Sequence, residues 1–240
     1  MRSLVATLLA ATAAAASTFN IAVTAPGVPL DFAMLDCVGS GHGSLALRAD
    51  YREHLTRVQR DIGFRSIRGH GLLSDDVSVY LGAGANLFNI YSIMDFYLSV
   101  GIKPFIELSF MPEALAYDPT KTIMHYRGIT SAPKSYDAWG AFIADVFRGL
   151  VDRYGVDVVR SWRTEVWNEP QGCGFYCPPP GVSNLDSYFQ LYNASARAIK
   201  SVDPLIPVGG PATAALAWVA DFVNYTQVTK APADYLTTHR

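Results

Sequence analysis

Short apolar runs alternate with longer amphipathic segments along most of the chain. Between residues 135 and 154 the apolar side chains recur mostly at every third or fourth position, as one face of a helix requires. Similar spacing predicts helices at residues 48–62, 89–100, 185–202 and 213–228. The apolar runs are only a few residues long, and each ends at or beside Gly, His, Asn or Met-Pro. They predict strands at residues 32–38, 64–70, 103–110, 161–167, 206–210 and 234–239.

Strands that alternate with helices predict an α/β fold with a parallel sheet and right-handed crossovers. Polar residues end or follow five of the six predicted strands, and in a closed barrel these strand ends meet at one rim. They are Ser40 and His42, Arg68 and His70, Glu107 and Ser109, Asn168 and Glu169, and His239. We therefore expect a (β/α)8 TIM barrel that is incomplete in this chain, with about six of its eight βα units present. The Gly-rich segment 39–43 lacks the lysine of a P-loop and the spacing of a dinucleotide fingerprint, so we expect no nucleotide cofactor.

The first residues have the pattern of a secretory signal peptide. Arg2 precedes a short apolar run and an alanine run that ends at Ala16, and the segment is too short to span a bilayer. We expect residues 1–16 to be a signal peptide, residues 17–240 to form one domain, and the protein to be secreted. Glycosylation sequons at Asn193 and Asn224 agree with an extracellular location.

Charge and cysteine content narrow the range of partners. The net charge is −2 and no run of basic residues occurs, so the chain lacks the electrostatic footprint of a protein that binds nucleic acid or an anionic membrane. Cys173 and Cys177 bracket a short part of a loop rich in Gly and Pro, where an oxidising compartment favours a local disulfide over two free thiols. The loop offers too few ligands for a metal. We expect Cys37 to be a small buried hydrophobe.

The segment 164–170 carries the clearest candidate chemistry. An aromatic and β-branched run leads to Asn168 and Glu169, and Pro170 stops the ladder because it has no N–H to donate. Strand alternation puts Glu165, Trp167 and Glu169 on one face. A carboxyl group at the mouth of a barrel strand can act as a proton donor. Taken alone, Glu169 could equally be a structural residue that caps a helix or pairs with an arginine.

The other carboxylates have structural roles in our interpretation. Glu165 is expected to pair with an arginine such as Arg68, because an unpaired carboxylate inside a barrel would be costly. Glu107 is expected to orient its neighbours. Asp75 and Asp76 are expected to cap or initiate the helical segment after the second strand.

Several blocks of the sequence, taken in order, resemble glycoside hydrolase family 39. That family includes β-xylosidases and, more distantly, α-L-iduronidases, and the Arg-Gly-His-Gly block is more similar to the xylosidases. The resemblance runs from about Cys37 to the last residue. The blocks are residues 37–42, 45–48, 68–73, 75–76, 103–105, 111–112, 133–136, 165–170, 208–212 and 238–239.

The resemblance implies a retaining hydrolase on a (β/α)8 barrel, with a carbohydrate such as a xylo-oligosaccharide as its substrate. One carboxylic acid protonates the leaving oxygen and a second carboxylate attacks the sugar. Glu169 matches the acid/base, and Asn168 matches the residue that hydrogen-bonds the 2-hydroxyl. His70 and His239 match histidines that contact the sugar, and His42 is a further candidate at the same rim.

Two departures from the family pattern affect this expectation. Gln171 and the segment 173–180 replace an Asn and a Phe-Trp pair, in a loop that would border the site. The sequence also ends after the sixth predicted strand, whereas the family's nucleophilic Glu lies at the end of the seventh. Three alternatives stay open at this point: part of a secreted β-xylosidase-like hydrolase, a noncatalytic sugar-binding remnant, or an α-L-iduronidase-like enzyme. The last needs cationic groups for its substrate carboxylate, for which Arg68 and Arg240 are the candidates.

Overall fold

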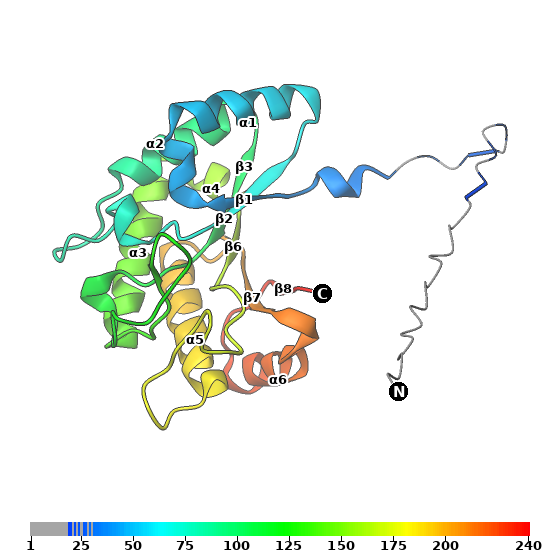
Figure 1. Ribbon diagram of the computed structural model, residues 1–240. Coiled ribbons are helices and arrows are strands. Elements are labelled where there is room, and N and C mark those ends of the chain that lie inside the picture. The colour runs from blue at the N-terminus through cyan, green and yellow to red at the C-terminus, as the bar shows by residue number, and fades with distance from the viewer. Residues whose placement is uncertain (1–18, 21, 23, 25, 28, 30) are drawn as a thin grey trace, which may run out of the picture. The chain divides into compact units, whose positions relative to one another are not determined.

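A six-stranded parallel sheet forms the centre of the computed structural model (Figure 1). Its strand order is β1-β2-β3-β6-β7-β8, and every neighbouring pair is parallel. These are six of the eight strands of a (β/α)8 barrel, so the expected fold class and its partial extent are confirmed. The bounds are β1 Val38–His42, β2 Ser66–His70, β3 Lys103–Glu107, β6 Arg163–Glu165, β7 Val208–Thr213 and β8 Tyr235–Thr238.

The structure describes residues 19, 20, 22, 24, 26, 27, 29 and 31–240. The expected signal peptide at residues 1–16 lies outside the described residues. Phe32–Arg240 form one compact unit. Within the described part of the chain, no helix is both long enough and apolar enough to cross a membrane.

The helices lie on the outer side of the sheet in an arc that runs from α1 and α2 to α5 and α6 (Figure 1). Ser135 and Ser183 cap the two longest, because their hydroxyls accept hydrogen bonds from the backbone N–H groups three residues later. The α-helices are α1 Ala49–Asp61, α2 Phe88–Ser99, α3 Tyr136–Tyr154, α4 Val156–Arg160, α5 Asn184–Val202 and α6 Val219–Thr229. The 3-10 helices are η1 Phe32–Leu35, η2 Gly43–Leu47, η3 Asp75–Val77, η4 Glu113–Leu115 and η5 Ala214–Leu216.

Helices α3 and α5 pack closely against each other. Trp139 of α3 is fully buried, and its Nε1 donates a hydrogen bond of 2.8 Å to the hydroxyl of Ser195 on α5. A Cβ on Gly140 would lie 3.4 Å from the carbonyl oxygen of Ala194, so the absence of a side chain there allows the two backbones to approach. This packing joins the two longest helices of the outer layer.

Three sequence predictions need correction. The first strand is Val38–His42 rather than residues 32–38, and the apolar run before it forms η1, where Phe32 and Met34 are exposed. The third and fourth strands end at Glu107 and Glu165, earlier than predicted. The helix predicted from residue 213 begins only at Val219, because β7 continues to Thr213 and left-handed backbone at Ala215, Leu216 and Trp218 interrupts the helical path.

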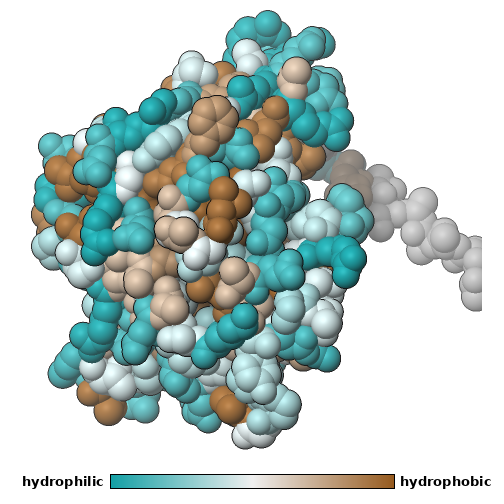
Figure 2. Space-filling view, turned by 90° about the vertical axis from the view of Figure 1, so that its left-hand side faces the viewer, coloured by the Kyte–Doolittle hydropathy of each residue, from teal (hydrophilic) through white to brown (hydrophobic). Residues whose placement is uncertain are grey.

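An antiparallel hairpin that the periodicity did not predict, β4 Thr122–Ile123 with β5 Gly128–Ile129, lies between β3 and α3 in the chain. A Cβ on Gly128 would lie 2.3 Å from the ring of Phe110, so only glycine allows the hairpin to approach this closely. The face of the molecule in Figure 2 mixes hydrophilic residues with patches of apolar ones. Such mixing is ordinary for a folded protein and does not by itself indicate a partner.

Candidate active site

The carboxyl ends of the strands bring most of the expected polar residues to one edge of the sheet. His42 ends β1, His70 ends β2, and Glu107 ends β3. Asn168 and Glu169 follow β6, and His239 follows β8. Because all six strands are parallel, these ends lie on the same edge, which is where barrel enzymes hold their reactive groups.

Arg68 on β2 is the electrostatic centre of this edge. Its Nε donates to Glu165 Oε2 at 2.7 Å, and its Nη2 lies 2.8 Å from Glu107 Oε2. Both carboxylate side chains are almost completely buried, with exposed fractions of 2% and 0%. The predicted pairing of Glu165 with Arg68 is therefore confirmed. Glu107, expected only to orient its neighbours, shares the same arginine.

The charges of the cluster support one another. Burial lowers the pKa of Arg68, but the negative charges of Glu107 and Glu165 outweigh it and raise that pKa above its ordinary value. Burial likewise raises the pKa of Glu107, but Arg68 and contacts from His70 and Ser109 outweigh it and hold that pKa below its ordinary value. The Nδ1 of His70 lies 2.8 Å from Glu107 Oε2. The cluster therefore keeps a buried carboxylate charged beneath the rim.

Asn168 is oriented by the same arginine. Its Oδ1 accepts a hydrogen bond of 3.0 Å from Arg68 Nη2, and the residue is 2% exposed. A guanidinium group only donates, so the amide oxygen must face Arg68. The amide nitrogen is then left to donate to a group at the rim.

Glu169 and His239 follow β6 and β8 and meet beyond the end of β7, which lies between those strands. His239 Nδ1 lies 2.8 Å from Glu169 Oε1, and the two side chains are 34% and 29% exposed, respectively. The backbone N–H of Glu169 donates to Ala212 at 2.8 Å, and that of His239 donates to Thr213 at 2.8 Å. Both residues are thus fixed by backbone hydrogen bonds to β7. Among the described residues none hydrogen-bonds Glu169 Oε2, so this oxygen is available for contact with a bound molecule.

The prediction that Glu165, Trp167 and Glu169 share one face is wrong. The strand ends at Glu165, and Trp167 and Glu169 have positive φ angles of 71° and 45°. These left-handed conformations turn the chain out of the ladder, at a cost of order 1–3 kcal/mol each. The buried indole of Trp167 stabilises the turn, because its Nε1 donates to the carbonyl of Phe175 at 2.8 Å and its ring packs edge-on against Phe110.

The side chain of His42 is largely buried and paired at the rim. Its Nε2 lies 2.6 Å from Asp76 Oδ2, its Nδ1 lies 3.1 Å from the carbonyl of His70, and only 8% of the residue is exposed. The ring of Tyr126, at the tip of the β4–β5 hairpin, stacks on it with centroids 3.6 Å apart. Burial raises the pKa of Asp76, but the hydrogen bond and charge of His42 outweigh it and lower that pKa below its ordinary value. His42 thus joins the hairpin to the rim, and any contact that it makes with a ligand uses a small exposed edge.

Asp75 and Asp76 begin η3 after the second strand, as expected, and Ser74 occupies the N-cap position without a side-chain hydrogen bond. Asp75 instead accepts hydrogen bonds from the backbone N–H of Glu113 at 3.0 and 3.2 Å. The two aspartates therefore join separate loops of the rim in addition to beginning a short helical turn. This pairing has no signal in the local sequence.

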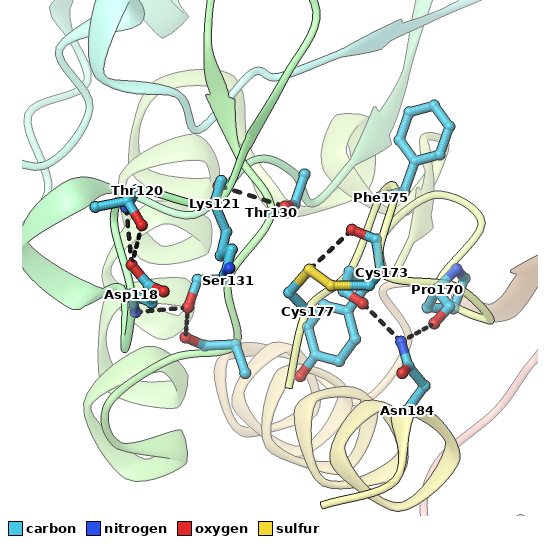
Figure 3. The surroundings of a disulfide bond; sticks show 12 residues. Asp118, Thr120, Lys121, Thr130, Ser131, Pro170, Cys173, Phe175, Cys177 and Asn184 are labelled. Atoms are coloured by element: carbon cyan, nitrogen blue, oxygen red, sulfur yellow. Dashed lines mark hydrogen bonds between the residues drawn. A yellow bond between two sulfur atoms is a disulfide. The ribbon is translucent and has the colours of Figure 1, made fainter. Parts of the chain in front are cut away.

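Cys173 and Cys177 are joined by a disulfide in the loop that follows Glu169 (Figure 3). Cys37 is half-buried rather than buried. Of the two sequons, Asn224 is exposed on α6, whereas Asn193 lies half-buried in α5, with its Oδ1 held by Arg197 Nε at 2.8 Å. These observations place the disulfide beside the rim and favour Asn224 as the accessible sequon.

No group of three or more His, Cys, Asp or Glu side chains suited to a metal ion occurs in the described part of the chain. A groove of about 550 Å³ lies between α3 and α5, lined by residues such as Tyr136, Gln190 and Arg197. It belongs to the outer helix layer and includes none of the rim residues, so we do not assign the chemistry to it.

Comparison with known proteins shows to which family the chain is similar. The family model "Glycosyl hydrolases family 39" matches residues 19–240. The chain belongs to glycosyl hydrolase family 39. A β-xylosidase of Caldicellulosiruptor saccharolyticus is 46% identical to this family 39 chain over 209 residues, which cover 85% of the chain and 42% of the relative. A solved family 39 β-xylosidase of Caulobacter crescentus matches with a TM-score of 0.80 and 37% identity, covering 91% of this chain and 49% of that one.

The α-L-iduronidase of Canis lupus familiaris is more distant from this family 39 chain, at 27% identity over 81 residues, or 34% of the chain and 12% of the relative. The chain spans less than half the length of the β-xylosidases that it matches. Two contacts at its rim were missed from the sequence: the stack of Tyr126 on His42 and the pairing of His42 with Asp76. The closest available signal for the hairpin was Gly128, because a glycine in a strand can mark a close approach of the backbone to a neighbour.

Proposed function

We propose that the chain carries the acid/base half of a retaining, β-xylosidase-like glycoside hydrolase, with Glu169 as the acid/base. The observation that carries the proposal is the placement of Glu169 beyond the carboxyl end of β6, partly exposed, with one carboxyl oxygen held by His239 and the other free. His239 at Oε1 leaves Oε2 to deliver a proton to the leaving oxygen and later to take one from water. Family membership and the similarity to β-xylosidases support the substrate class.

Asn168 fits the role of a donor to the sugar's 2-hydroxyl. Arg68 fixes its amide so that the nitrogen faces away from the guanidinium. A hydrogen bond at this hydroxyl that strengthens in the transition state supplies several kcal/mol in retaining glycosidases. His70, held beside Glu107, is a second candidate for contact with the sugar.

Retaining hydrolysis also needs a second carboxylate about 5–5.5 Å from the first, to attack the sugar. We place this nucleophile on a strand beyond the six in this sequence, where the resemblance puts it. The intact mass of the deglycosylated protein from its native source tests this part of the proposal. A mass well above 26.1 kDa supports it, whereas a mass that fits this chain alone leaves sugar binding without hydrolysis.

We further propose that the protein is secreted after removal of residues 1–16. The apolar and alanine-rich segment before Ala16 motivates this step. Sequencing of the N-terminus of the protein from culture medium tests it. A protein that stays inside the cell with Met1 intact contradicts it.

Hydrolysis of aryl glycosides tests the function itself. The protein from its native source should release the phenol from an aryl β-xyloside, and Glu169→Gln should lower kcat about 10²–10⁴-fold, the usual contribution of a general acid. Activity on an aryl α-L-iduronide with none on the xyloside would overturn the substrate class. Xylo-oligosaccharide binding that survives Glu169→Gln, with no hydrolysis by either protein, would identify a binding protein instead.

A further inference from the structure

The disulfide loop beside Glu169 has one half that is anchored to the rest of the molecule. The backbone N–H of Cys177 donates to Thr130 at 2.7 Å, and its carbonyl accepts from Ala132 at 2.8 Å. Asn184, at the start of α5, donates its amide to the carbonyl of Tyr176 at 2.6 Å (Figure 3). Tyr176 and Cys177 are buried, so this half is held independently of the disulfide.

The other half of the loop has little to hold it except the disulfide. Gly172, Cys173 and Gly174 are exposed, and a Cβ on either glycine would meet nothing within 4 Å. The backbone hydrogen bonds that Gly172 makes go to Phe175 and Tyr176, within the loop itself. Glycine has the greatest conformational freedom of any residue. Opening the disulfide would therefore release this half while the anchored half stays in place.

Phe175 lies at the junction of the two halves, where its carbonyl accepts a hydrogen bond of 2.8 Å from Trp167 Nε1, and its side chain reaches the rim of the site. Its ring centroid is 6.3 Å from that of His70 and 6.4 Å from that of Phe110, with which it is nearly parallel. In Figure 3 the ring of Phe175 points away from the disulfide. The residue is half-buried, so part of it is accessible. An apolar ring in this position can pack against the C–H face of a sugar.

We propose that the Cys173–Cys177 disulfide is a positioning element for the substrate site, which keeps Phe175 beside His70 as one wall of the sugar pocket. The inference deepens the proposed hydrolase function and rests on it for the identity of the ligand. Cys173 is exposed and open to a dithiol reductant such as dithiothreitol. The reductant gives up two electrons and two protons, the S–S bond breaks, two cysteine thiols form, and the dithiol closes to its own cyclic disulfide.

Steady-state hydrolysis of an aryl β-xyloside, with and without dithiothreitol, tests the positioning role. Reduction should raise KM about two- to tenfold, the range that an aromatic packing contact contributes, with less than about a twofold change in kcat. The double variant Cys173→Ser/Cys177→Ser should show the raised KM without reductant and should not respond to it. Cys37→Ser is the matched control, because it removes the free thiol and should respond to reductant as the unmodified protein does.

Phe175→Ala should reproduce the raised KM, and reduction should then change it no further. Hydrogen exchange supplies a readout that does not depend on activity: reduction should speed exchange at residues 172–176, because the N–H groups of Phe175 and Tyr176 bond to Gly172, and leave Cys177 and the strands unchanged. Unchanged exchange and KM on reduction would overturn the positioning role. A fall in kcat together with faster hydrogen exchange across the sheet would show that the disulfide stabilises the whole fold and does not position Phe175. If the oxidised protein hydrolyses nothing, the proposed function fails, while the exchange experiment still decides whether the disulfide positions Phe175.

Discussion

Replacement of Arg68 by methionine tests the electrostatic centre of the site. Methionine retains most of the apolar volume of arginine but removes the charge that lies between two buried carboxylates. Glu107 and Glu165 are 0% and 2% exposed, and both lie within 2.8 Å of the guanidinium group of Arg68. Asn168 would lose its donor as well.

The expected loss of stability is large because the charges left behind are buried. Removal of one partner of a buried ion pair destabilises a protein by about 3–5 kcal/mol. We expect Arg68→Met to fall in this range at neutral pH. The lost stability should shrink as the pH falls, because protonation of Glu107 removes one of the unpaired charges.

Urea unfolding monitored by tryptophan fluorescence measures the effect, since Trp139, Trp162 and Trp167 are buried in the folded protein. Arg148→Met is the matched control. Arg148 lies 2.6 Å from Asp145 on α3, but the two side chains are 58% and 47% exposed. An exposed pair on a helix contributes only about 0.3–0.5 kcal/mol.

A loss below about 1 kcal/mol for Arg68→Met, similar to that of the control, would refute the reasoning. So would a loss that grows as the pH falls. A second variant separates charge from packing: adding Glu165→Gln to Arg68→Met should recover part of the lost stability, because it removes one of the two unpaired charges.

The pKa of Glu107 is held below its ordinary value of 4.5, so its contribution to stability is complete above that pH and is lost as the pH falls toward the folded-state pKa. The unfolding free energy measured from about pH 5 to about pH 3 should therefore fall less steeply in Glu107→Gln than in the unmodified protein, by at most about 1.4 kcal/mol per pH unit; equal slopes would contradict this. Asn168→Ala should lower kcat on an aryl β-xyloside about 10²-fold but lose little on the 2-deoxy substrate, and equal losses on both would exclude contact with the 2-hydroxyl. Secretion from a yeast host followed by peptide mapping should find a glycan at Asn224 and none at Asn193, whose sequon serine is fully buried; the reverse occupancy would contradict the structure.

The sequence predicts those features that depend on local pattern or on the energetic penalty for an unpaired buried charge. Alternating apolar runs and amphipathic segments predicted the order of the six strands in the α/β fold. The energetic penalty for an unpaired buried carboxylate predicted the pairing of Glu165 with Arg68, which lie 97 residues apart in the sequence. Contacts that have neither a local pattern nor such a penalty were not predicted from the sequence. Asp76 pairs with His42 over 34 residues, and either aspartate of its loop could have done so on local grounds.

Local rules also failed where backbone geometry departs from regular structure. Strand alternation assumes extended residues, whereas Trp167 and Glu169 are left-handed, so the faces assigned to them were wrong. The first strand was predicted to end at residue 38, yet Gly39 and Gly41 belong to β1. A Cβ on Gly69 of β2 would lie 2.5 Å from the hydroxyl of Ser40, so β1 and β2 approach each other more closely than side chains would allow.

The most direct test of the account is whether the activity lost in Glu169→Gln depends on the leaving group of the substrate. A general acid matters only where the departing oxygen needs a proton, so the variant should lose about 10²–10⁴-fold in kcat/KM on a xyloside with a poorly acidic alcohol as leaving group. On 2,4-dinitrophenyl β-xyloside, whose phenolate leaves without protonation, the loss should be far smaller. Equal losses on the two substrates would contradict the assignment of Glu169 as the acid that protonates the leaving group.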